Sequence, residues 1–184
     1  MTLTEMKLDI AKRQKKGIHF ILASIFIWGA ILIVQISSLP ILTKNLLTFC
    51  FSAPLLPLAF IISKIIKVDF TSKDNPLSRP GLLFSINQVL YILIAIWVYP
   101  TVPDKLVMIL AMIYGAHLLP YSWLYDSKSY FLMSIFITPA ILIIGIIYNP
   151  VIIAAIMLVC QIIFSILLLI EIKTFNYKIL ANKN

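Results

Sequence analysis

Charged residues are scarce in this sequence, and acidic residues are the scarcest of them. Seven Asp and Glu stand against fifteen Lys and Arg in 184 residues, while 61% of the chain is hydrophobic. A chain this apolar cannot form a soluble domain. In a soluble protein the net charge of +8 would suggest nucleic-acid binding. Here cytoplasmic loops that face anionic lipid headgroups account for the charge, and we expect no nucleic-acid partner.

Cysteine and histidine are also rare, with two of each. Cys50 and Cys160 fall at different depths of two apolar stretches, which argues against a disulfide because its Cα atoms must lie within about 7 Å. His19 and His117 do not complete a zinc site with them. We therefore expect free thiols, no metal and no cofactor.

Common enzyme motifs are missing. The sequence contains no H-E-x-x-H, no G-x-S-x-G and no G-x-x-x-x-G-K-[ST]. No pair of carboxylates lies inside an apolar stretch, since Asp126 and Glu171 fall at the edges of such stretches. Acid–base or two-metal catalysis needs more than this, so we expect that the protein is not an enzyme.

Long apolar stretches are what the sequence has in abundance. At about 1.5 Å per residue, each is long enough to cross a hydrocarbon core of roughly 30 Å. The predicted fold class is an all-α integral membrane bundle of six transmembrane helices, formed by residues 17–172. The predicted spans are 18–39, 46–63, 82–99, 106–124, 130–148 and 151–172.

The basic residues are distributed very unevenly over the loops. If the first span leaves the cytoplasm, thirteen of the fifteen Lys and Arg lie on the cytoplasmic side, and only Lys44 and Lys105 lie outside. The positive-inside rule therefore predicts that both termini are cytoplasmic. Residues 173–184 are predicted to form a cytoplasmic tail at the membrane interface.

Residues 1–16 have the pattern of an amphipathic helix. Thr2 and Glu5 have the spacing of a capping box, and Asp9 and Arg13 form an i,i+4 pair of opposite charge. The narrow apolar stripe comprises Leu3, Met6 and Ile10. We expect a cytoplasmic helix that lies on the membrane surface, the alternative being a basic tail that only sets the topology.

Polar side chains within the spans gather in the third and fourth spans. At 100° per residue, three of them share one arc of the fourth span, and three more open the third span at a similar depth. Since polar groups in a bilayer face neighbouring helices or a wet cavity, we predict that they line one cytoplasm-facing ligand-binding pocket. The candidate residues are His117, Tyr121, Tyr114, Asn87, Gln88 and Tyr91.

Each of these polar groups also has a purely structural interpretation. The amides of Asn87, Gln88 and Gln161 are suited to interhelical hydrogen bonds. His117 is suited to a hydrogen bond with a tyrosine or with a carbonyl that Pro120 releases. His19 and Glu171 lie near enough to the interface to be solvated.

Several segments resemble a family. These are Asp74-Asn75-Pro76-Leu77-Ser78, Asn87-Gln88 with Leu90-Tyr91, and the run from Gly115-Ala116-His117 to Trp123-Leu124-Tyr125. Together they resemble an uncharacterised family of small, multi-span membrane proteins of bacilli and related bacteria, over nearly the whole chain. The resemblance implies a bacterial plasma-membrane location, and it implies no activity and no site residue.

Two functional classes follow from these observations. The first is a small-molecule or lipid-binding membrane protein, or a carrier, that uses the polar pocket. The second is a non-catalytic accessory or protective subunit that pairs with another membrane protein, or with copies of itself. A carrier keeps its polar residues around a wet cavity, whereas an accessory subunit buries them in helix contacts.

Overall fold

The computed structural model describes residues 1–72 and 74–181, and all the regular secondary structure in this part of the chain is helical. Within it, six helices are long and apolar enough to cross a membrane, which confirms the predicted fold class. Lys73 and residues 182–184 of the predicted tail, with Lys183, lie outside the described residues. The helices are α1 (Leu3–Arg13), α2 (Ile18–Ile36), α3 (Ile41–Ser52), α4 (Leu55–Ile65), α5 (Ser78–Thr101), α6 (Leu106–Leu124), α7 (Lys128–Ile147) and α8 (Pro150–Ala181), with short 3-10 turns η1 (Lys15–Gly17) and η2 (Pro103–Lys105).

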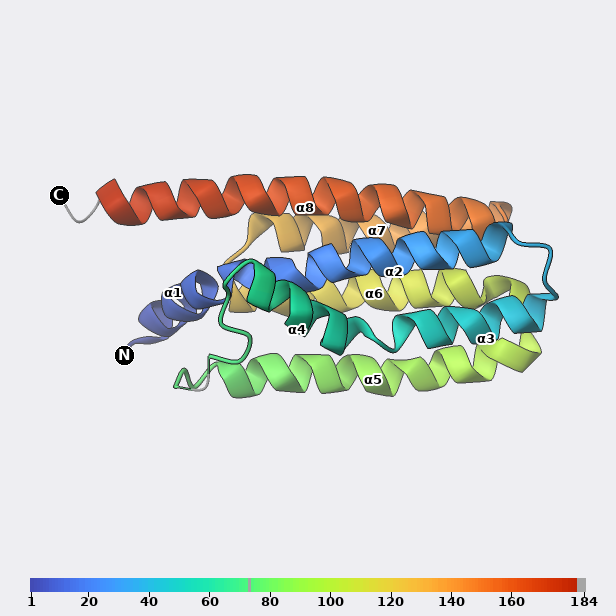
Figure 1. Cartoon of the computed structure of the whole chain (residues 1–184), viewed down its shortest axis with the longest axis horizontal. Coiled ribbons are helices and arrows are strands. Elements are labelled where there is room, and N and C mark those ends of the chain that lie inside the picture. Colours follow the sequence, from blue (N-terminus) through green and yellow to red (C-terminus); the bar gives the residue numbers. More distant parts are fainter. Residues whose placement is uncertain (73, 182–184) are drawn as a thin grey trace.

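The second span is broken, whereas the sequence pattern predicts one continuous apolar stretch. It consists of α3 and α4, which are separated at Ala53 and Pro54 (Figure 1). Pro54 and Pro57 have no N–H group to donate, and a proline ring clashes with the preceding turn of a helix, so two prolines this close interrupt the hydrogen-bond ladder. The first turn of α4 therefore lies within the bundle and not at its end.

The core lies between α2, α6, α7 and α8. α2 packs along α8, and α6 packs along α7. Phe164, Met157 and Leu168 of α8 are completely buried among them. α4 packs mainly on α2, and α5 packs mainly on α6, so these two helices leave most of their apolar side chains on the outside of the bundle.

Small residues allow α6 and α7 to approach each other closely. An added Cβ at Gly115 would lie 2.9 Å from the Ile137 side chain and 2.7 Å from the Thr138 hydroxyl. Gly145 on α7 faces the flexible Met108 side chain of α6 in the same way. Close packing of small residues is a principal source of helix association in lipid, where the hydrophobic effect is absent.

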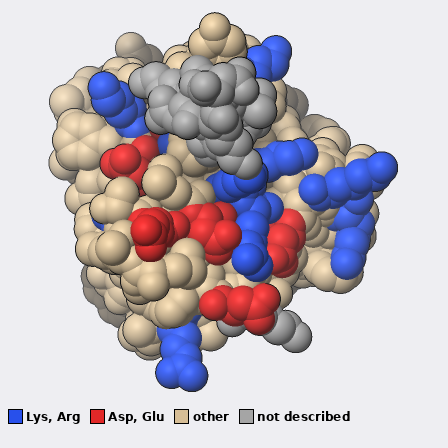
Figure 2. Space-filling view, turned by 90° about the vertical axis from the view of Figure 1, so that its left-hand side faces the viewer, with Lys and Arg blue, Asp and Glu red and all other residues tan. Residues whose placement is uncertain are grey.

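The two ends of the bundle differ in charge. α1 and the C-terminal part of α8 lie at the same end, and this charged end carries both basic and acidic side chains (Figures 1 and 2). At the far end, Lys44 donates to the carbonyl of Gln35 (2.9 Å) and Lys105 donates to that of Gly145 (2.7 Å). Both lysines therefore neutralise the negative C-terminal ends of helices, α2 and α7 respectively.

The N-terminal helix docks on the end of the bundle. Its capping box is present, since Thr2 N donates to Glu5 Oε2 (2.8 Å), and the Arg13–Asp9 pair closes at 2.9 Å. Met6 and Ile10 of the apolar stripe pack against the main core. Two of the three stripe residues therefore pack on protein while Leu3 stays exposed, and the placement of this helix on the membrane surface stays a prediction.

We expect Gly115→Ala to destabilise the protein by about 1–3 kcal/mol, because the new methyl group would press on the β-branched Ile137, which cannot move aside. Gly145→Ala should also destabilise the protein, since the new methyl group would press on Cβ and Cγ of Met108, close to its backbone. Gly29→Ala is the matched control, because no atom lies within 4 Å of its added Cβ. Unfolding in detergent with increasing SDS measures all three, and equal costs at the three positions would contradict this account.

Candidate functional site

A left-handed turn joins α1 to α2 and forms the base of the site. Lys15, Lys16 and Gly17 have φ angles of 42°, 50° and 71°, a conformation that costs a non-glycine residue about 1–2 kcal/mol. Gly17 also lacks room for a side chain, since a Cβ there would lie 2.9 Å from the Tyr130 hydroxyl and 3.1 Å from the Tyr125 ring. The surrounding contacts must therefore hold this turn in place.

A buried ion pair holds the turn. The Lys16 side chain is 4% exposed, and its ammonium donates to Glu171 Oε1 of α8 at 2.7 Å and to the Asp126 carbonyl at 3.0 Å. The other carboxylate oxygen of Glu171 accepts hydrogen bonds from the Ser127 hydroxyl (2.9 Å) and from the amide and hydroxyl of Ser129. This pair ties together the α1–α2 turn, the α6–α7 loop and α8.

Two tyrosines connect this turn to the interior. Tyr125 donates its hydroxyl to Gln14 Oε1 (2.7 Å), and Tyr130 donates to the carbonyl of Lys16 (2.9 Å). Burial raises the pKa of Tyr125 well above its ordinary value, so its hydroxyl stays protonated and remains a donor. The hydroxyls of both residues point at the turn, while their rings face a cavity.

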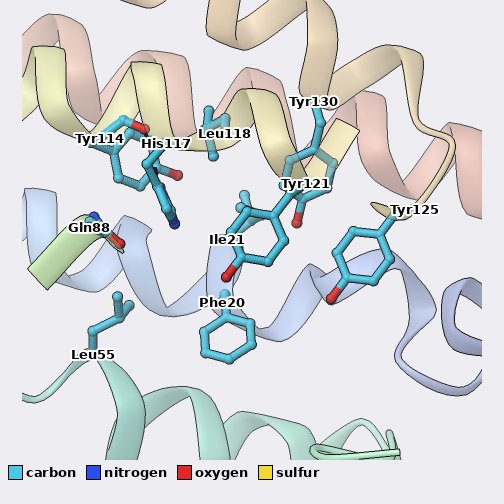
Figure 3. A pocket seen from close by; sticks show the side chains of 10 residues that line it. All are labelled: Phe20, Ile21, Leu55, Gln88, Tyr114, His117, Leu118, Tyr121, Tyr125 and Tyr130. Carbon is cyan, nitrogen blue, oxygen red and sulfur yellow. Dashed lines mark hydrogen bonds between the residues drawn. The ribbon is translucent and has the colours of Figure 1, made fainter. Parts of the chain in front are cut away.

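The cavity has a volume of about 50 Å³ and is surrounded mainly by aromatic rings (Figure 3). It lies between the beginning of α2, the first residue of α4, the middle of α5 and the second half of α6, with Tyr130 from α7. None of the described lining residues carries a formal charge at neutral pH. They are Phe20, Ile21, Leu55, Gln88, Tyr114, His117, Leu118, Tyr121, Tyr125 and Tyr130.

The structure brings some of the predicted site residues together and separates others. Tyr114, His117 and Tyr121 line the cavity with Gln88. Asn87 and Tyr91 do not line it, because they lie on an exposed side of α5 and bond to each other, Asn87 Nδ2 donating to the Tyr91 hydroxyl at 3.0 Å. A helix turns by 100° per residue, so α5 can point only one of the two neighbouring amides at the cavity.

His117 faces the inside of the bundle. Its ring lies edge-on against Tyr121, with centroids 5.1 Å apart, and its Nδ1 lies 3.4 Å from the carbonyl of Tyr114. Tyr114 in turn donates to Gln161 Oε1 on α8 (2.6 Å), which also accepts from Ser24 on α2 (2.8 Å). Gln161 therefore links three helices, in agreement with its predicted role in interhelical hydrogen bonding.

His19 is not solvated, contrary to the sequence-based expectation, whereas Glu171 is only partly buried, with 21% of its side chain exposed. His19 is completely buried, and its ring packs against Phe20 (4.4 Å between centroids) and Phe70 (5.4 Å), with no hydrogen-bond partner among the described residues. The loop between α4 and α5 folds back over the start of α2 and covers it. Glu171 accepts hydrogen bonds from the α6–α7 loop, which covers part of its side chain.

The sequence pattern missed the residues at the turn. Lys16 and Gly17 look like the end of a basic lead-in, and Tyr125 and Tyr130 look like aromatic residues of a membrane interface. One signal was available, since Glu171 is the only acidic residue in the last apolar stretch. A lone carboxylate at the edge of a membrane span needs a cation or several hydrogen-bond donors beside it to compensate its charge.

The fold and the site define a multi-pass helical protein, with six spans suited to a bilayer and a small uncharged cavity between them. Over residues 3–171 the chain matches the family described as "Family of unknown function (DUF7010)", and it belongs to that family. No curated protein and no solved structure matches it. The family membership agrees with the expected resemblance to an uncharacterised family.

We expect Lys16→Met or Glu171→Gln alone to destabilise the protein by about 1–3 kcal/mol, because each leaves a largely buried charge without its counter-ion, although hydrogen bonds to that charge remain. The double variant Lys16→Met/Glu171→Gln should recover a large part of this loss. Asp9→Asn is the control, since it breaks the exposed Arg13–Asp9 pair and should cost less than about 1 kcal/mol. SDS-induced unfolding measures these costs, and simple additivity of the two single changes would show that no coupled pair exists.

Proposed function

We propose that this protein is a non-catalytic membrane protein that binds a small molecule or a lipid in the cavity between α2, α4, α5 and α6. The proposal rests on the types of residue that line the cavity. Aromatic and aliphatic walls surround a few polar groups that converge from two helices, Gln88 from α5 and His117 from α6. This composition is typical of small-molecule sites, in which few polar groups fix the orientation of the ligand.

The polar groups that line the cavity differ in whether they already form hydrogen bonds within the protein. The hydroxyls of Tyr114, Tyr125 and Tyr130 already donate to other parts of the protein, so these residues offer mainly their ring surfaces. Gln88 takes part in no hydrogen bond among the described residues, and only one nitrogen of His117 has a contact at hydrogen-bonding distance. These two side chains are therefore the ones that we assign to ligand recognition.

The break in the second span supports the same assignment. Leu55, the first residue of α4, lines the cavity. Helices interrupted inside the membrane place their free backbone groups at substrate sites in many transporters. The first N–H groups of α4 have no partner within that helix, and they begin at the cavity wall. A carrier function would use this feature, and simple binding requires only the cavity.

We further propose that the charged end of the bundle faces the cytoplasm of a bacterial cell. Residues that gather there include Lys12, Arg13, Lys64, Lys67 and Arg79, whereas the far end has Lys44 and Lys105, both bound to helix carbonyls. The positive-inside rule supports this orientation.

Reporter fusions test the orientation. A cytoplasm-active reporter should give signal when fused within the 66–77 loop or after the C-terminus, and a reporter active only outside should give signal after Pro40 or Pro100. The expected pattern follows from the cost of moving the basic loops across the membrane. Activity of an outside reporter in the 66–77 loop would reverse the topology.

Native mass spectrometry of the detergent-released protein tests the binding proposal. We expect the wild type to carry a bound mass, and His117→Ala and Gln88→Ala to lower its occupancy by up to about tenfold each, the effect of losing one hydrogen bond. Asn87→Ala is the matched control, because Asn87 neighbours Gln88 on α5 but lies outside the cavity. Absence of any bound small molecule, or an added mass of a second protein in its place, would favour the accessory-subunit function instead.

A further inference from the structure

The cavity is closed toward the charged end. The rings of Tyr125 and Tyr130 lie 5.6 Å apart, and their hydroxyls are fixed to the left-handed turn. Beside them, Phe70 from the 66–77 loop packs on Phe20 and Phe60, with 5.5 Å between centroids in both cases. Two groups of packed aromatic rings thus lie between the cavity and the charged end, Tyr125 with Tyr130 and Phe70 with Phe20 and Phe60.

The loop that carries Phe70 is fixed in place. Lys15 Nζ donates to the carbonyl of Ile66 (2.9 Å), and the amide of Asp69 donates to the carbonyl of Arg13 (3.2 Å). Farther along the loop, Asn75 Nδ2 donates to the carbonyl of Met6 on α1 (2.8 Å). Burial alone would raise the pKa of Asp69, but hydrogen bonds from Ser72 and Thr71 lower it, so this carboxylate remains charged and keeps the loop folded.

The side of the cavity between α4 and α5 has no such group of packed rings among the described residues. α4 packs on α2 and α5 packs on α6, so Leu55 and Gln88 face each other across the edges of two separate helix pairs, and both are partly exposed. Their neighbours Leu56 and Val89 are 58% and 62% exposed. In a bilayer these exposed apolar side chains contact lipid tails, and the cavity therefore borders the hydrocarbon region.

We propose that the cavity opens sideways into the bilayer, between Leu55 and Gln88, and admits an uncharged alkyl chain or ring of an amphipathic molecule dissolved in the membrane. This inference rests on the proposed binding function and specifies its ligand class. The lining offers no charged residue to compensate a buried charge, which would be costly at this depth. At about 50 Å³ the cavity holds only part of such a molecule, so the remainder lies between α4 and α5.

Fluorescence quenching of a tryptophan in the cavity wall tests the direction of the opening. Trp28, Trp97 and Trp123 are replaced by Phe, and Phe20→Trp supplies the reporter in lipid nanodiscs, where both membrane faces are open to water. Phosphatidylcholine with brominated acyl chains quenches by contact from the bilayer, and iodide quenches from water. Two control variants, each keeping a single native tryptophan, give the range of quenching. Trp97 (64% exposed) is the lipid-exposed reference, and Trp28 (4% exposed) is the buried reference.

We expect brominated lipid to quench the Phe20→Trp reporter nearly as strongly as Trp97, and iodide to quench it no more than Trp28. Adding Phe70→Ala should make the reporter sensitive to iodide, because that change removes the ring that covers Phe20 from the side of the 66–77 loop. Leu55→Trp, on the opposite wall, repeats the measurement if Phe20→Trp does not fold. Quenching by iodide with Phe70 intact, or by neither agent at both positions, would overturn the lateral opening. The assay uses no bound native ligand, so its failure is distinguishable from a failure to find a ligand by mass spectrometry.

Discussion

The rest of the site depends on one interaction, the buried ion pair between Lys16 and Glu171. Removing two charges from water is costly, and this cost is offset only when every donor and acceptor of the pair is satisfied. Here Ser127 and Ser129 donate to Glu171, and the Lys16 ammonium also donates to the Asp126 carbonyl. The pair brings together segments more than 100 residues apart in sequence and stabilises a strained turn. That turn holds the two tyrosines that close the cavity at the charged end.

Lipid imposes the second constraint, because polar groups inside the bundle must find partners within the protein. Most of them do so across helices, as the Ser24–Gln161–Tyr114 cluster shows. Near the cavity this rule is relaxed, since Gln88 and one nitrogen of His117 have no protein partner among the described residues. An aromatic wall and a broken helix beside these two polar groups distinguish this region from the tightly packed contact between α6 and α7.

Much of the fold can be predicted from the sequence, because a helix that crosses a membrane must be of a certain length and mostly apolar. Six apolar stretches predict six spans, and a 100° rotation per residue correctly places Tyr114, His117 and Tyr121 on one side of α6. The same periodicity could not decide between Asn87 and Gln88, since that choice depends on which side of α5 meets α6. Nor could it reveal that Lys16 is buried, because that requires knowing that α8 returns beside the first turn of α2.

Lysine labelling tests the central claim, that a buried ion pair closes the charged end of the bundle. A water-soluble amine reagent applied to the folded protein, followed by peptide mass spectrometry, compares Lys16 with Lys12 four residues earlier. Lys12 is exposed, whereas Lys16 is 3% exposed and bound to Glu171. The account predicts that Lys12 reacts rapidly, and that Lys16 stays unmodified until Glu171 is replaced by Gln. Equal labelling of both lysines in the wild type would contradict it.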